Sequence, residues 1–146
     1  MLDQMDNKLS KFKKLSDIRC PPKGWVRAIR VALGMNGRQL ATRLGMSIPG
    51  VSALETNEAN GKVTLNTLRR AAEALDCTLV YGFAPRTTLR EMVHKQTLKI
   101  ARTQVGYVSH TMQLEDQLPS KKTLEKEIKR VTDDLMNNWP RTLWDE

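Results

Sequence analysis

Residues 36–56 have the sequence NGRQLATRLGMSIPGVSALET, in which two short amphipathic helices are separated by a glycine turn. Leu40, Ala41 and Leu44 lie at positions i, i+1 and i+4, so they share one face of the first helix. Gly45 follows the last turn of that helix, where a left-handed backbone is needed and glycine adopts it without strain. These residues therefore predict a helix that ends in a tight turn.

The residues after the turn predict the start of a second helix. Ser47 is placed as its N-cap, because a serine hydroxyl accepts a hydrogen bond from a free amide of the first turn. Pro49 falls in that first turn, where its missing N–H donor costs little. Val51 and Leu54 are then expected to point inward. Helix, glycine turn and helix in this order are typical of the DNA-binding helix-turn-helix.

Apolar residues on both sides of this motif supply the rest of a small core. Trp25, Ile29 and Leu33 form a stripe on a preceding helix. A following helix carries Leu65, Leu68, Ala71, Ala72 and Leu75. Residues 77–83 predict a short strand that either pairs across a dimer or covers the core. We therefore expect an all-α helix-turn-helix domain with helical extensions at both ends and this short strand.

The chain is expected to have three segments. Residues 1–24 form a basic helical arm that ends at the double proline Pro21-Pro22, and residues 25–85 form the helix-turn-helix domain. Residues 86–146 form a helical extension with one helix to about Leu114 and another from about residue 120 to 138. The tail that follows contains two tryptophans, and we expect it to be frayed rather than a contact site.

Composition limits the kinds of partner that the protein has. The 146 residues carry a formal net charge of +8 with two cysteines, and this basic balance favours nucleic acid, a membrane surface or an acidic protein. The sequence lacks the apolar run of about 18 residues that a membrane span needs, and its N-terminus lacks the apolar core of a signal peptide. We therefore expect a cytoplasmic protein with no membrane partner.

Residues 38–76 resemble the Xre, or lambda-repressor-like, helix-turn-helix family. The matching positions are Leu40-Ala41, Leu44-Gly45, Ser47, Val51-Ser52, Glu55, Leu65, Leu68, Ala72, Ala74 and Leu75. One position departs from the family pattern, because Gly37 stands where the family usually has glutamine. The resemblance implies a DNA-binding domain of the phage-repressor kind.

A longer stretch is similar to the family called mobile mystery protein A. The segments that carry this similarity are PPKGWVRAIRVALGM, LRRAAEALDCTLVYGFAP and REMVHKQTLKIARTQVGYVSHTMQLEDQ, within about residues 20–118. Members of that family are usually encoded beside mobile mystery protein B, which carries a Fic domain. The resemblance implies a regulatory or antitoxin-like partner of a Fic-type toxin.

The second helix of the motif is expected to lie in the major groove. We predict base contacts from Ser47, Ile48, Pro49, Gly50, Ser52 and Ala53. The serines can form hydrogen bonds to base edges, and the apolar residues can contact the thymine methyl group. This face has no long polar side chain, so direct readout is expected to be modest, with more dependence on phosphate contacts and DNA shape.

Phosphate contacts are predicted from four residues around the motif: Arg38, Gln39, Arg43 and Lys62. The first two begin the scaffold helix, and Lys62 lies in the loop after the recognition helix, where backbone amides can also donate. Glu55 is expected to be structural and to form an ion pair within the domain.

These observations together predict a sequence-specific repressor that binds double-stranded DNA as a homodimer, because one recognition helix seldom gives enough affinity. Its expected target is the promoter of its own operon, shared with a Fic-domain partner. The alternative is an antitoxin-like module that neutralises a Fic-type toxin, with DNA binding secondary. We find no catalytic arrangement in the sequence, and we predict no enzyme activity, no cofactor and no metal site.

Overall fold

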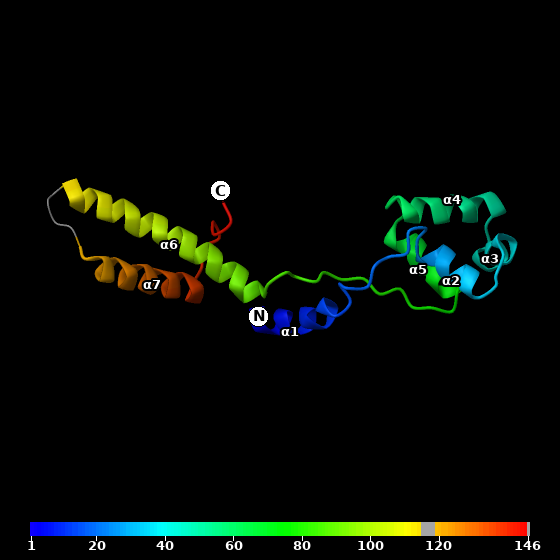
Figure 1. Ribbon diagram of the computed structural model, residues 1–146, viewed down its shortest axis with the longest axis horizontal. Coiled ribbons are helices and arrows are strands. Elements are labelled where there is room, and N and C mark those ends of the chain that lie inside the picture. The colour runs from blue at the N-terminus through cyan, green and yellow to red at the C-terminus, as the bar shows by residue number, and fades with distance from the viewer. Residues whose placement is uncertain (115–118, 146) are drawn as a thin grey trace. The chain divides into compact units, whose positions relative to one another are not determined.

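The computed structural model of the protein describes residues 1–114 and 119–145, which contain seven helices and no strand (Figure 1). The helices are α1 (Leu2–Lys13), α2 (Trp25–Ala32), α3 (Gly37–Leu44), α4 (Ile48–Ala59), α5 (Leu65–Ala74), α6 (Leu89–Leu114) and α7 (Lys121–Asn137). The predicted all-α class is confirmed. No helix within the described ranges has both the length and the apolar character that crossing a membrane requires.

The chain divides into two compact units. The central unit is Lys14–Phe83, and the terminal unit is formed by Met1–Lys13 together with Ala84–Glu146. This division differs from the three segments expected from the sequence, because α1 packs with the C-terminal helices. The N-terminal helix also ends at Lys13, well before the double proline that was expected to end it.

In the central unit, α2 to α5 surround one small apolar core. Its buried members are Val26, Leu40, Ala41, Leu44, Val51, Leu54, Ala71 and Leu75. The inward positions expected for α3 and α4 are confirmed. The stripe expected on the preceding helix is wrong in part, because Trp25 remains 44% exposed and Leu33 58% exposed. Since α2 turns its Val26 and Ile29 edge toward the core, these flanking residues face away from it.

The turn between α3 and α4 forms as its residues predict. Gly45 has φ 64° and ψ 36°, the left-handed conformation that ends α3. The hydroxyl of Ser47 accepts from the backbone N–H of Gly50 over 3.1 Å, and Pro49 lies in the first turn of α4. Local signals alone therefore fix the angle at which the chain enters α4.

Residues 77–83 do not form the predicted strand within the chain. They follow α5 as an extended segment with no regular secondary structure (Figure 1). A strand requires a neighbouring strand to accept and donate its backbone hydrogen bonds. The described residues of one chain offer no such neighbour.

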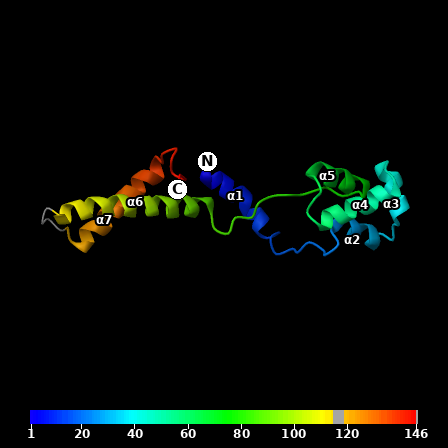
Figure 2. The same ribbon diagram turned by 90° about the horizontal axis from the view of Figure 1, so that it is seen from above.

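In the terminal unit, α6 and α7 lie side by side in both views of the molecule (Figures 1 and 2). The buried residues of α6 recur every fourth position: Val93, Thr97, Ala101 and Val105. Toward the C-terminal end of α6 the apolar side chains are more open, with Val108 53% exposed and Met112 41% exposed. The helix continues through Gly106 without interruption.

Helix α1 caps the beginning of α6. The Asp6 carboxylate accepts from the backbone N–H groups of Leu89 (2.6 Å) and Arg90 (3.2 Å). Asp3 forms a bidentate ion pair with the Arg90 guanidinium, with both N–O distances at 2.9 Å. The first amides of a helix have no partner inside the helix, so two carboxylates at that end stabilise it. These contacts explain why residues 1–13 join the terminal unit.

The C-terminal tail is ordered against α6, so the expectation of a frayed tail is wrong for the described residues. Leu143 is 1% exposed, and its carbonyl accepts from the side-chain amide of Gln96 over 2.9 Å. The tryptophans remain more open, with Trp139 at 42% and Trp144 at 58% exposed. The tail is therefore anchored by an aliphatic side chain rather than by its aromatic ones.

Candidate nucleic-acid interface

Helix α4 has one face committed to the core and another open to solvent. Val51, Leu54 and Glu55 are buried at 2%, 5% and 7% exposure. The residues between them and at the helix start are exposed: Ser47, Ile48, Pro49, Ser52 and Ala53. The structure thus brings five of the six predicted base-contact residues onto one open surface.

The sixth predicted base-contact residue, Gly50, has a different environment. It is half-buried, and a Cβ atom placed on it would lie 3.1 Å from the Ser47 hydroxyl oxygen and 3.5 Å from the Met46 sulfur. Its backbone N–H is also occupied by Ser47. Gly50 therefore serves the packing of the first turn of α4.

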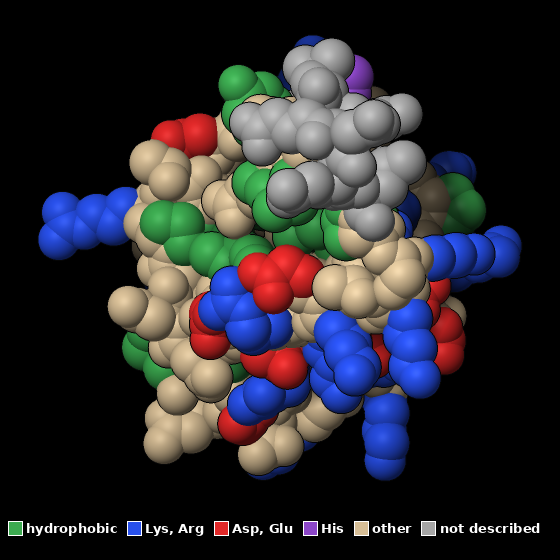
Figure 3. Space-filling model, turned by 90° about the vertical axis from the view of Figure 1, so that its left-hand side faces the viewer, with side chains coloured by type: hydrophobic (Ala, Val, Ile, Leu, Met, Phe, Trp, Pro, Cys, Tyr) green, Lys and Arg blue, Asp and Glu red, His purple; other side chains and the backbone are tan. Residues whose placement is uncertain are grey.

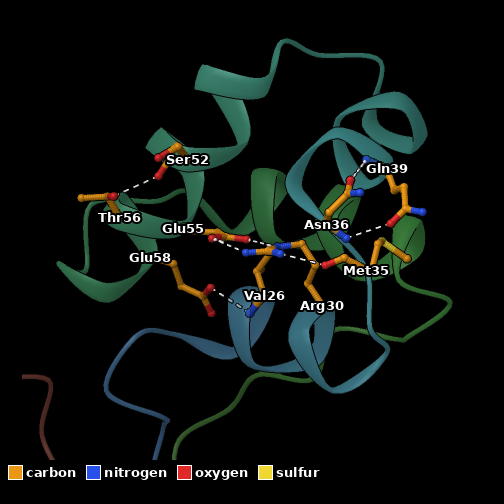
Figure 4. A network of polar contacts seen from close by, with 9 residues as sticks. All are labelled: Val26, Arg30, Met35, Asn36, Gln39, Ser52, Glu55, Thr56 and Glu58. Carbon is orange, nitrogen blue, oxygen red and sulfur yellow. Dashed lines mark hydrogen bonds and ion pairs between the residues drawn. The ribbon is translucent and has the colours of Figure 1, made fainter.

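An ion pair connects α4 to α2 (Figure 4). Arg30 donates through Nε to Glu55 Oε1 over 2.6 Å and through Nη2 to Oε2 over 3.1 Å. Its third nitrogen, Nη1, donates to the carbonyl of Met35 over 2.8 Å. The Glu55 hydrogen bonds raise the pKa of the Arg30 guanidinium above its ordinary value. The expectation that Glu55 pairs within the domain is confirmed.

A second carboxylate of α4, one turn further on, caps the start of α2. Glu58 accepts from the backbone N–H of Trp25 over 2.8 Å and from that of Val26 over 3.0 Å (Figure 4). Gly24 stands at the N-cap with φ 81° and has no side chain to do this. Glu58 was not singled out from the sequence, because a glutamate in a helix gives no sign of a partner 33 positions away.

The start of α3 is held by a reciprocal capping box (Figure 4). The side-chain oxygen of Asn36 accepts from the backbone N–H of Gln39 over 2.9 Å, and the side-chain oxygen of Gln39 accepts from the backbone N–H of Asn36 over 2.8 Å. Gln39 nevertheless remains exposed, so its amide nitrogen is accessible. A helix N-terminus of this kind favours anions such as phosphate.

The four predicted phosphate contacts differ in how free their side chains are. Arg38 in the first turn of α3 and Lys62 in the loop after α4 are exposed. Arg43 is exposed too, but its Nη1 donates to the carbonyl of Ala74 at the end of α5 over 3.1 Å. In the reverse direction, Arg70 of α5 donates to the carbonyl of Leu44 at the end of α3 over 3.3 Å.

These two arginines satisfy carbonyl groups that have no partner within their own helices. They also join α3 to α5, which lie far apart in the sequence. Arg43 therefore has a structural contact that the sequence did not predict, and of the three predicted cations it is the one with a hydrogen bond inside the domain.

The pair of helices α6 and α7 presents a surface that mixes acidic and basic side chains instead of a purely cationic one. Figure 3 shows Lys and Arg side chains of this face standing among Asp and Glu. On α7, Arg130 pairs with Glu127 over 2.6 Å and with Asp134 over 2.9 Å. Cations that are paired in this way release few counterions from DNA. This surface is less suited to the phosphate backbone than the exposed side of α3 and α4.

Residues 26–81 match the family model HTH_3, described as helix-turn-helix. They form an Xre/lambda-repressor-like helix-turn-helix domain. The match runs from α2 to beyond α5 and so contains every member of the central core. The protein thus carries a DNA-binding domain of the kind found in Xre-type regulators, and α4 is the second helix of its helix-turn-helix. Searches of curated proteins and of solved structures gave no match. The narrower resemblance to mobile mystery protein A stays a prediction.

Proposed function

We propose that the protein is a sequence-specific repressor that binds operator DNA as a homodimer. The observation that carries this proposal is the division of α4 into two faces. Its two carboxylates, Glu55 and Glu58, hold it against α2, while its opposite face is open to solvent. A rigidly held helix with an open face is what major-groove readout requires.

The open face suits a limited kind of base recognition. The Ser47 hydroxyl oxygen already accepts from Gly50, so its proton is left to donate to a base acceptor. Ser52 is exposed and can donate or accept. Ile48, at 47% exposed, and Ala53 offer apolar contact to a thymine methyl group. We infer that the operator contains thymines opposite this turn of α4 and that DNA shape contributes to selectivity.

Orientation on the duplex would come from phosphate contacts. Arg38 and Gln39 flank the N-terminus of α3, where backbone amides and side chains can approach the same phosphate. Lys62 lies beyond the C-terminal end of α4 and would contact a phosphate on the other side of the groove. Together these groups fix the register from which α4 meets the base edges.

The experiment is an anisotropy titration of labelled DNA from upstream of the protein's own gene, with a scrambled duplex of equal length as control, at two salt concentrations. We expect much tighter binding to the upstream DNA. Lys62→Ala should weaken binding to both duplexes by the same factor and lower the salt slope by about 1. Ser52→Ala should instead change the ratio of the affinities for the upstream and the scrambled duplex. Equal affinity for the two duplexes would contradict a sequence-specific repressor.

We also propose that the operon encodes a Fic-domain partner, on the strength of the resemblance over residues 20–118. A neighbouring gene whose protein contains the motif His-Pro-Phe-x-x-Gly-Asn-Gly-Arg would support the regulation of a Fic-type toxin. Its absence would leave a repressor without that partner. Neutralisation of a toxin by this chain remains the alternative role.

A further inference from the structure

The segment Cys77–Phe83 has the composition of a strand without a strand's hydrogen bonds. Its sequence, CTLVYGF, is rich in β-branched and aromatic residues, which favour strands. The Cys77 N–H donates to the Ala72 carbonyl over 2.8 Å, and within the described residues the backbone groups of residues 78–83 have no ladder partner. An unpaired, uncharged extended segment is a template for pairing with another chain.

The segment also lies beside an incomplete part of the core. A cavity of about 240 Å³ opens between α2, α5 and this segment. Its lining includes Trp25, Ile29, Leu68, Leu75 and Leu79. Further along the segment, Tyr81 is 61% exposed and Phe83 is 82% exposed. Exposed apolar side chains that gather on one segment in this way mark candidate interaction sites.

We propose that two copies of the protein pair through this segment as an antiparallel two-stranded sheet centred on Tyr81. The proposal rests on the homodimer of the proposed function and names the surface that forms it. An antiparallel pair of identical strands has a two-fold axis perpendicular to the sheet, so the interface is isologous and closes with two copies. Its occupant is therefore a second copy of this chain.

The register follows from the residues that it places opposite each other. With Tyr81 opposite Tyr81, Leu79 of one copy faces Phe83 of the other on the same side of the sheet. Leu79 lines the open cavity, so the second copy's Phe83 arrives at the edge of that cavity and covers it. The two-fold axis generates a second contact of the same kind, so Leu79 of each copy faces Phe83 of the other.

The absence of charge in the segment allows this pairing. Residues 77–85 contain no charged side chain, so the pair forms without repulsion although each chain has a net charge of +8. Asp76 and Arg86 flank this uncharged stretch, and Asp76 lies outside the extended segment because its backbone is left-handed, with φ 56°.

The position of the segment links this pairing to DNA binding. It follows α5 directly and belongs to the same compact unit as α4. A sheet at this place would relate the two recognition helices by its own two-fold axis. Operators with two half-sites demand that symmetry of a helix-turn-helix dimer.

Disulfide cross-linking tests the register. The background is the full chain with Cys20→Ser and Cys77→Ser, because both native cysteines are free and exposed. Three variants of this background each carry one new cysteine, at residue 80, 81 or 83. Opposed Cα atoms in an antiparallel pair are about 4.5–5.5 Å apart, within disulfide range. Residues 83 of the two copies would lie about 13 Å apart along the strands.

We therefore expect Tyr81→Cys to form a covalent dimer under mild oxidation at least 10-fold faster than Val80→Cys or Phe83→Cys. The double variant with Leu79→Cys and Phe83→Cys should cross-link as efficiently as Tyr81→Cys. Faster cross-linking at residue 80 would overturn the register. Absence of cross-linking in all of these variants would overturn the interface.

Sedimentation of the full chain tests the surface without relying on cysteines. Phe83→Asp should weaken self-association at least 10-fold. The matched control is Tyr107→Asp on α6, since Tyr107 is 77% exposed and carries an aromatic ring of similar size. A monomeric wild-type protein, or a loss of association only in Tyr107→Asp, would overturn the proposal.

The titration with upstream DNA separates this inference from the proposed function. If Phe83→Asp is monomeric and also loses affinity for the upstream duplex, the dimer interface and the repressor function are both supported. If the wild-type protein binds that duplex specifically while Phe83→Asp remains dimeric, the interface fails and the repressor stands. If Tyr81→Cys cross-links as expected but no duplex is preferred, the interface stands and the repressor fails.

Discussion

The Arg30 guanidinium and the Glu55 carboxylate form a bidentate pair between α2 and α4, with a shortest N–O distance of 2.6 Å. The two side chains are only 14% and 8% exposed. The pair therefore holds α4 by its buried face, where water competes little for either charge.

Glu55→Gln should destabilise the central unit by about 3 kcal/mol, because it leaves the Arg30 charge largely buried without a compensating carboxylate. Urea unfolding followed by circular dichroism measures this change. The control is Glu125→Gln on α7, which is exposed and should change stability by less than about 0.5 kcal/mol. Equal effects of the two substitutions would mean that the ion pair contributes nothing specific.

Gly24→Ala should destabilise the protein by about 2 kcal/mol, since the residue has φ 81° and an added Cβ atom would lie 2.6 Å from Glu58 Oε2. The clash would displace the carboxylate that caps α2. The control is Gly37→Ala, where nothing lies within 4 Å of the added atom. That substitution should be neutral or stabilise α3 by about 0.5 kcal/mol, and thermal unfolding of both variants distinguishes the two outcomes.

Gly37→Gln should strengthen DNA binding by a similar factor for specific and scrambled duplexes. It restores the amide that Xre-type domains usually carry at the start of this helix, and the open space around Gly37 accommodates it. An added neutral phosphate hydrogen bond of about 1 kcal/mol corresponds to roughly five-fold in affinity. Gly37→Ala controls for helix propensity, and the same gain in both variants would refute the phosphate role.

Leu143→Ala should destabilise the terminal unit by about 3 kcal/mol, because it removes a side chain that is 1% exposed and leaves a cavity against α6. Trp144→Ala is the neighbouring control, and its larger but 58% exposed side chain should cost much less. Denaturant unfolding compares the two. A larger effect of the tryptophan would show that the tail is held by its aromatic residue instead.

The pKa of Asp3 should lie below its ordinary value of 3.8, because the Arg90 guanidinium donates hydrogen bonds to it and adds an attractive charge. A depressed pKa means that this contact favours the folded state above pH 3.8 and is lost as the pH falls through the lower folded value. Carboxyl carbon NMR titration gives the pKa directly. Arg90→Gln should return it toward 3.8, and an unchanged value in that variant would exclude the ion pair as the cause.

Residues with long-range partners are where sequence reasoning reached its limit. Arg43 was predicted to contact phosphate from its place on α3, yet it donates to the carbonyl of Ala74, 31 positions away. Asp6 looked like one acidic residue in a basic arm, yet it caps α6 at Leu89. A surface carboxylate or guanidinium has many possible partners of similar energy, and only the packed arrangement of helices selects among them.

The sequence by itself determined the helix-turn-helix, because its signals act within a few residues. Gly45 adopts its left-handed conformation, Ser47 caps the next helix, and the apolar spacing of Leu40 and Leu44 faces the core wherever the domain is placed. Only the tertiary structure decided which charged side chains hold α4 against the rest of the domain and which remain exposed. That choice depends on distances between helices that are set by the packing of the whole core, which no local pattern encodes.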